Sequence, residues 1–155
     1  MSLEAFMLSV GVPAGMESVS VSRTIGTPES VVREHIADRE RFIEAAGFDE
    51  VTVDGDCITM ANSVGLLTIE LTLRCFGSDA VLAYEQVEGI FETMETRYTL
   101  ADAAEGVTVT ATTEFALDVD VVGSILDGTI IARQRKRELN GQFDYLETAT
   151  RDRSP

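Results

Sequence analysis

Two tyrosines and a group of glutamates are the side chains in this sequence best suited to chemistry. Tyr84 and Tyr98 each carry a phenol, which can donate and accept a hydrogen bond at the end of an apolar ring. Four glutamates lie near them in the sequence: Glu85, Glu88, Glu92 and Glu95. Paired carboxylates can act as general acid and base where burial separates their pKa values. A solvated acidic hairpin is the simpler interpretation, so the tyrosines are the better candidates for polar contacts with a ligand.

The remaining reactive side chains indicate neither a metal site nor a disulfide scaffold. His35 is the only histidine; it lies in a predicted helix without a neighbouring nucleophile, which favours a packing role. If residues 57 and 75 lie on a hairpin that turns near residues 63 and 64, Cys57 faces about residue 70. Cys75 is then roughly 15 Å further along, beyond the reach of a disulfide. We therefore expect two small buried thiols and no cofactor.

Composition limits the classes of protein to which the chain can belong. Its 155 residues suit one domain, and 45% hydrophobic content argues against disorder. The net charge of -15 disfavours nucleic acid and anionic lipid as partners. The basic residues cluster only at Arg133, Arg135, Lys136 and Arg137, about one helical turn. No run of 18 apolar residues and no basic leader occur, so we expect a cytoplasmic protein without stable membrane insertion.

The choice of basic residue points to the cellular environment. Eleven residues are Arg and one, Lys136, is Lys. Short acidic side chains hold water and cations, whereas the long Lys stem exposes apolar surface. At molar salt the Debye length is about 3 Å, so acidic self-repulsion costs little. This pattern favours a protein adapted to high salt over one that is merely acidic and encoded by a GC-rich genome.

Hydrophobic periodicity predicts a strand, two short helices and a meander of strands. Residues 17–25 alternate as a half-buried strand, with Val19 and Val21 on one face. Thr27 and Pro28 begin a helix that runs to about residue 36, and Asp38 caps a second that ends at residue 46. Six further strands follow, separated by short turns that favour antiparallel neighbours. They are expected at about 49–53, 57–61, 67–75, 81–87, 91–100 and 107–117, with a turn at 62–65.

After residue 120 the period becomes helical. One amphipathic helix is expected from about 122 to 150, with polar residues at 133–138 largely off its apolar stripe. The stripe thins between Ile131 and Leu139. Gly128 and Gly141 interrupt the helix, either because neighbouring backbone approaches closely or, at Gly128, to leave room for a ligand.

The order of these elements resembles the START/Bet v 1-like (SRPBCC) superfamily, including polyketide cyclase/dehydrase-like and lipid-transport-like members. The resemblance covers about residues 17–148. It is carried by the first strand, the Thr-Pro-Glu helix start at 27–29, residues 36–38, and 138–143 in the last helix. It implies an α+β helix-grip fold, in which a curved antiparallel seven-stranded sheet wraps around a long C-terminal helix. Residues 16–150 would form this domain, with an extension at 1–15 and a tail at 151–155.

The resemblance also implies a cavity between the sheet and the last helix that binds a hydrophobic small molecule. With no Trp and 6% aromatic residues, little bulk is available to fill such a space. Its mouth is expected where the turns at 62–65 and 88–91 and the connection at 118–123 share one end. The candidate ligand-binding residues are Leu67, Ile69, Leu71, Leu73, Tyr84, Met94, Tyr98, Phe115, Leu126 and Ile130.

Three functions follow as hypotheses. The first is a carrier or sensor of an apolar or amphipathic small molecule, favoured because no nucleophile, metal or phosphate-loop motif is present. The second is an enzyme of the cyclase, aromatase or hydratase kind, with Tyr84, Tyr98 or a glutamate as acid or base. The third is a protein-interaction module. The residues give no signal for an oligomeric state, and the fold alone does not choose among these hypotheses.

Overall fold

The structure, a computed structural model, describes residues 16–64, 66–117 and 128–152. The elements, in chain order, are β1 (Met16–Ile25), α2 (Glu29–Ala37), α3 (Arg39–Glu44), β2 (Glu50–Asp54), β3 (Cys57–Val64), β4 (Leu67–Cys75), β5 (Leu82–Glu88), β6 (Phe91–Ala103), β7 (Gly106–Leu117) and α5 (Gly128–Asp152). None of these helices is both long enough and apolar enough to cross a membrane.

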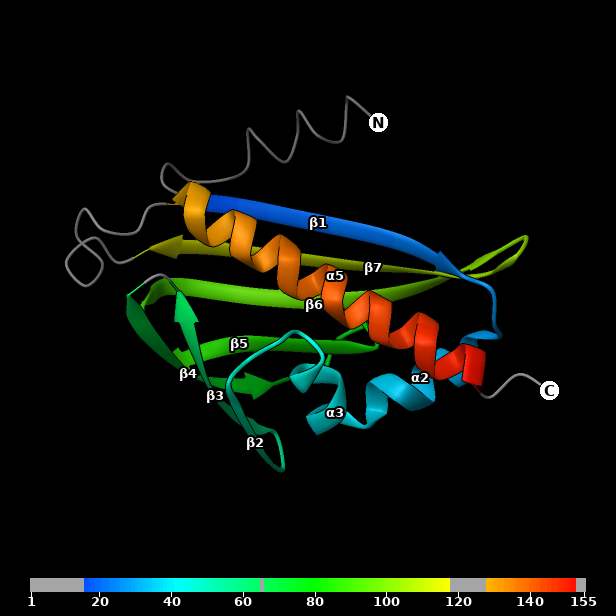
Figure 1. Ribbon diagram of the computed structural model, residues 1–155, viewed down its shortest axis with the longest axis horizontal. Helices are drawn as coiled ribbons and strands as arrows, with labels where there is room; N and C mark the ends of the chain where they lie inside the picture. The colour runs from blue at the N-terminus through cyan, green and yellow to red at the C-terminus, as the bar shows by residue number, and fades with distance from the viewer. Residues whose placement is uncertain (1–15, 65, 118–127, 153–155) are drawn as a thin grey trace.

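The expected seven-stranded antiparallel sheet is confirmed. The strands lie in the order β1-β7-β6-β5-β4-β3-β2, so β1 pairs with the last strand and β2 to β7 form the meander. α5 lies across one face of this sheet, and α2 and α3 lie beside the C-terminal half of α5 (Figure 1). The architecture is therefore α+β, with the core between the sheet and the three helices.

Strand alternation explains which residues enter the core. In β7, Val107, Val109, Ala111 and Phe115 are fully buried on the inner face, while Thr108, Thr110 and Thr112 between them face outward. On the outer face these threonines bond to hydroxyls of β1: Ser20 to Thr112 at 3.1 Å, Ser22 to Thr110 at 2.7 Å and Thr24 to Thr108 at 2.9 Å. β1 thus joins the sheet through side-chain ladders as well as through its backbone.

The register of the β3–β4 hairpin corrects the expected position of the cysteines. β3 runs on to Val64, so the pairing places Cys57 opposite Arg74 instead of residue 70. Adjacent residues of a strand point to opposite faces, so Cys57 lies on the outer face and Cys75 on the inner face. Cys57 is accordingly exposed, against expectation, and Cys75 is buried. Both are free, and burial raises the pKa of the Cys75 thiol.

The two short helices are held by their buried faces. α2 begins one residue later than expected, with Pro28 at the N-cap instead of Thr27. Asp38 precedes α3 as expected, but its side chain makes no capping hydrogen bond. Four side chains anchor the pair in the core: Val32, Ile36, Phe42 and Ile43. Gly47, whose φ is 96°, follows α3 in a conformation that favours glycine.

Close contacts at three points fix the position of α5. Arg23 of β1 donates hydrogen bonds to Asp144, to Glu147 at 2.8 Å and to Asn140 at 3.0 Å. A β-carbon on Gly141 would lie 2.8 Å from the carbonyl oxygen of Ala45, so the absent side chain lets α5 approach the end of α3. At Gly128 it would lie 2.8 Å from the Glu17 carboxylate. Both glycines thus lie at close approaches, and Gly128 is not among the residues that line a cavity.

Candidate functional site

A cavity lies between α5 and the inner face of the sheet. The centre of a water-sized sphere can occupy about 40 Å³ of it, and the empty space between the lining atoms is about 500 Å³ when space open to solvent is included. Fourteen residues line it: Phe48, Met60, Asn62, Ile69, Leu71, Leu73, Tyr84, Ile90, Phe91, Met94, Ile131, Gln134, Arg135 and Glu138. Small-molecule sites typically combine such an apolar lining with a few polar groups.

The sheet supplies the apolar wall. Ile69, Leu71 and Leu73 project inward from β4 at every second residue, and Met60 and Met94 extend the wall on either side. Leu73 is fully buried, whereas Leu71 is partly exposed. Five of the sheet residues proposed from the sequence, Tyr84 included, therefore line the cavity.

The helix supplies a buried ion pair that the sequence analysis missed. Nη1 of Arg135 donates a 2.6 Å hydrogen bond to Oε1 of Glu138, and the two side chains are only 9% and 5% exposed. The other carboxylate oxygen accepts from Asn62 of β3 at 3.1 Å and from Gln134 at 3.2 Å. Such additional bonds offset the cost of removing both charges from water.

The guanidinium of Arg135 also reaches the sheet. Nη2 donates to the Tyr84 hydroxyl at 3.4 Å and to Thr96 Oγ1 at 3.3 Å, both long bonds. Burial lowers the pKa of Arg135, but neighbouring Tyr84 and Glu138 outweigh this effect and raise it, so the side chain stays charged. Its Nε is buried and has no hydrogen-bond partner among the described residues.

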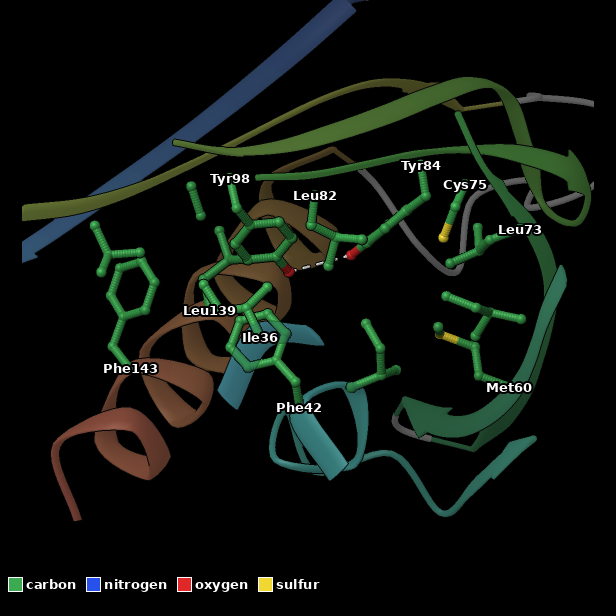
Figure 2. Close-up of a cluster of buried hydrophobic side chains, with 14 of the residues drawn as sticks. Ile36, Phe42, Met60, Leu73, Cys75, Leu82, Tyr84, Tyr98, Leu139 and Phe143 are labelled. Atoms are coloured by element: carbon green, nitrogen blue, oxygen red, sulfur yellow. Dashed lines mark hydrogen bonds between the residues drawn. The ribbon is translucent and has the colours of Figure 1, made fainter. Parts of the chain in front are cut away.

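A directed chain of hydrogen bonds leads from Arg135 away from the cavity. Gln142 Nε2 donates to the carbonyl of Phe42 at 3.1 Å, which leaves Gln142 Oε1 to accept from Tyr98 at 2.6 Å. Because Tyr98 donates its only hydroxyl proton to Gln142, its hydroxyl oxygen must accept a hydrogen bond from the Tyr84 hydroxyl, 3.3 Å away. Figure 2 shows the two phenols pointing toward one another. The chain thus runs from Arg135 through both tyrosines to α3.

Tyr98 is part of the polar support of the site and does not line the cavity. It is fully buried and packs edge-on against Phe42, with the ring centroids 5.2 Å apart. Burial raises its pKa well above the usual value of 10.0, and the neighbouring Tyr84 phenol raises it further, whereas Arg135 acts in the opposite direction. Tyr98 therefore stays a neutral phenol at ordinary pH, which suits a hydrogen-bond donor and not a general base.

The other proposed residues lie in different places. Phe115 is fully buried beside Phe91, with their ring centroids 5.2 Å apart, and does not line the cavity. Ile130 is 39% exposed and does not line this cavity, whereas the neighbouring Ile131 does. Leu67 belongs to β4, although its side chain is not described. Leu126 lies outside the described residues.

The helical residues of the site follow a pattern visible in the sequence. Ile131, Arg135, Glu138 and Gln142 are spaced four, three and four residues apart, in phase with the buried Leu139. The apolar stripe thins here because polar residues occupy its core positions. Arg135 is therefore not part of the exposed basic cluster expected from the sequence. Asn62, expected in a turn, is instead a buried residue of β3.

Three of the four glutamates near the tyrosines lie on the outer face of the sheet, away from the cavity. Glu85, Glu95 and Glu114 pair in register across β5, β6 and β7, and with Glu92 they line a separate groove on the outer face. Alternation explains this, because Tyr84 points inward and Glu85 outward. This placement agrees with the simpler interpretation of these glutamates, a solvated acidic hairpin. Within the described residues, no group of three or more His, Cys, Asp and Glu side chains could hold a metal ion.

Comparison with solved structures places the fold. A START superfamily protein from Mycobacterium smegmatis aligns with a TM-score of 0.67 at 9% identity, covering 90% of this chain and 99% of its own. The Zhui aromatase/cyclase from Streptomyces sp. R1128 aligns at 0.66 and 19% identity, covering 85% and 94%. Ara h 8.0201 aligns at 0.63 and 13% identity, covering 87% and 97%. No protein-family model and no curated protein sequence matches this chain.

These likenesses confirm the resemblance inferred from the sequence at the level of the fold. The seven-stranded sheet with its C-terminal helix is the helix-grip fold of START and Bet v 1-like proteins. This fold is compatible with the binding of hydrophobic small molecules. Identities between 9% and 19% carry the architecture and no site residue.

Proposed function

We propose that this protein binds an apolar or amphipathic small molecule in the cavity between α5 and the sheet, as a carrier or sensor. One observation carries the proposal: an apolar wall formed by β3, β4 and β6 faces a buried, hydrogen-bonded polar cluster on α5 across the same space. An apolar ligand body would gain from burial against the wall. A single polar group of the ligand could be oriented by the cluster.

The experiment that tests this proposal has two independent readouts. Purified protein is denatured and extracted into organic solvent for mass spectrometry, and separately titrated with Nile red, an uncharged dye that fluoresces in apolar sites. We expect a copurifying hydrophobic compound, or saturable Nile red binding to the emptied protein. Repeatedly empty extracts together with no saturable Nile red signal would contradict the proposal.

A matched pair of variants locates the binding site. Ile90 lies in the β5–β6 turn and lines the cavity, whereas Val87 on the same hairpin is 50% exposed and does not. Ile90→Trp should fill part of the space and weaken Nile red binding at least tenfold, and Val87→Trp should leave it unchanged. Equal effects of the two substitutions would place the dye elsewhere.

A cyclase or aromatase activity is a second candidate. The observation in its favour is that Tyr84 and Glu138 line one cavity in a fold shared with a named aromatase/cyclase. Such a reaction joins a methylene carbon to a carbonyl carbon within one chain and releases water, so it needs a base and a proton donor. Against it, both oxygens of Glu138 already accept hydrogen bonds from three neighbours. Binding without turnover is therefore the primary proposal.

The enzyme hypothesis has its own test. The protein would be incubated with a linear poly-β-ketone thioester, and cyclised product would be measured by chromatography. Tyr84→Phe should abolish product formation if this phenol donates the proton, while Tyr145→Phe, outside the cavity, should not. Product formed equally by both variants would remove Tyr84 from the reaction.

A further inference from the structure

Resting on the proposed function, we infer that the cavity selects ligands whose polar group is an uncharged hydrogen-bond acceptor, a hydroxyl or a carbonyl, over the corresponding carboxylates. The basis is the charge of the Arg135 and Glu138 pair together with the one N–H group that the pair leaves unused.

The charges that line the cavity disfavour a ligand carboxylate. Among the described lining residues only Arg135 and Glu138 are charged, and at 2.6 Å each neutralises the other. A ligand carboxylate would therefore enter a site with no net positive charge and would lie near a second carboxylate. Burying such an uncompensated anion is strongly unfavourable. The net charge of -15 on the whole chain also repels anions.

Arg135 has one buried N–H donor that its described neighbours leave unused. Nη1 of Arg135 bonds to Glu138, and Nη2 bonds to Tyr84 and Thr96. Nε remains buried without a partner among the described residues, although buried N–H groups are nearly always paired. The two Nη2 bonds are 3.4 and 3.3 Å long, so a small rotation of the guanidinium could turn Nε toward a ligand. One uncharged acceptor on the ligand would give Nε of Arg135 a hydrogen-bond partner without adding charge to the site.

Three probes of similar size and different polar group test the inference. 2-Naphthol, naphthalene and 2-naphthoate are each used to displace Nile red at about pH 7, where the naphthol is neutral and the naphthoate is an anion. We expect 2-naphthol to bind about tenfold more tightly than either of the others. Equal affinities, or tightest binding of 2-naphthoate, would overturn the inference and leave the proposed function intact. Only an absence of saturable Nile red binding would contradict both the inference and the proposed function.

Two variants of the ion pair distinguish recognition by Arg135 from a general preference for polar aromatics. Arg135→Met with Glu138→Met in one chain removes both charges and the Nε donor together, so no unpaired charge is left buried. This double variant should keep Nile red binding but bind 2-naphthol and naphthalene equally. Glu138→Gln leaves Arg135 uncompensated, so 2-naphthoate should become the tightest of the three. A double variant that retains the full preference for 2-naphthol would overturn the assignment, whether or not Glu138→Gln folds.

Discussion

The hydroxyl groups of Tyr84 and Tyr98 lie 3.3 Å apart, and the proton between them belongs to Tyr84. The assignment follows from the far end of the chain, where the Phe42 carbonyl can only accept and thereby orients the Gln142 amide. Tyr98 must then donate to Gln142 and accept from Tyr84. The cavity is in this way connected to the short helix α3 by oriented bonds, although α3 contributes no side chain to its lining.

Tyr98→Phe should destabilise the fold by about 1–3 kcal/mol, because it leaves Gln142 Oε1 without its donor in a buried place. Urea unfolding measures the change, with Tyr145→Phe as the control outside this chain. An unchanged unfolding midpoint would mean that Gln142 finds another donor and that the chain of bonds is not structural.

The pKa of Tyr98 predicts a loss of stability at high pH. Burial raises this pKa well above 10.0 in the folded protein, so above about pH 10 the unfolded state loses its proton first. The contribution of the Tyr98 phenol to the free energy of unfolding is fully present below about pH 10. It decreases as the pH rises from there toward the raised pKa. Urea unfolding at about pH 8 and about pH 11 should show a smaller fall for Tyr98→Phe than for the wild type. Equal falls would assign the alkaline loss to other groups.

Glu138→Gln should cost about 3–5 kcal/mol of unfolding free energy, because it leaves the Arg135 charge buried without its partner. Arg33→Gln is the control: it breaks an exposed pair, at 54% and 36% side-chain exposure, and should cost less than about 1 kcal/mol. Chemical denaturation of both variants gives the comparison. Similar small losses would show that water reaches the Arg135 and Glu138 pair.

Gly141→Ala should destabilise the protein although Ala favours helices. The helical preference would contribute up to about 1 kcal/mol, but the new β-carbon would lie 2.8 Å from the Ala45 carbonyl oxygen. Backbone has to move to relieve this contact, at about 1–3 kcal/mol. The control is Gly77→Ala, whose β-carbon would meet no atom within 4 Å. A higher melting temperature for Gly141→Ala than for the wild type would contradict the close approach of α3 and α5.

The melting temperature should rise between low and molar KCl. Glu85, Glu95 and Glu114 lie opposite one another on three adjacent strands, where like charges repel. Glu114→Gln should therefore raise the melting temperature at low salt and have almost no effect at about 1 M KCl, where the Debye length is about 3 Å. Thermal unfolding across a KCl series tests both statements. A wild-type melting temperature indifferent to salt would refute the adaptation to high salt predicted from the sequence.

Local patterns in the sequence predicted most of the fold. Alternation places residues such as Leu73 on one face of a strand whatever the rest of the chain does, so the strands could be read from neighbouring residues. Turn positions were less certain: β3 extends to Val64, and this shift places Cys57 opposite Arg74 instead of residue 70. A small error in a turn changes every pairing along a hairpin.

The sequence by itself therefore determined the order of the elements and the alternation that gives each strand an apolar face. Only the tertiary structure decided that Arg135 and Glu138 lie inside. A polar side chain takes a core position only where partners satisfy it, and here the partners on the sheet are distant in the chain. Asn62 lies 76 residues from Glu138, and Tyr84 lies 51 residues from Arg135. Periodicity identifies a helix and its phase, but the bonds that allow charges into the core depend on how the sheet curves around it.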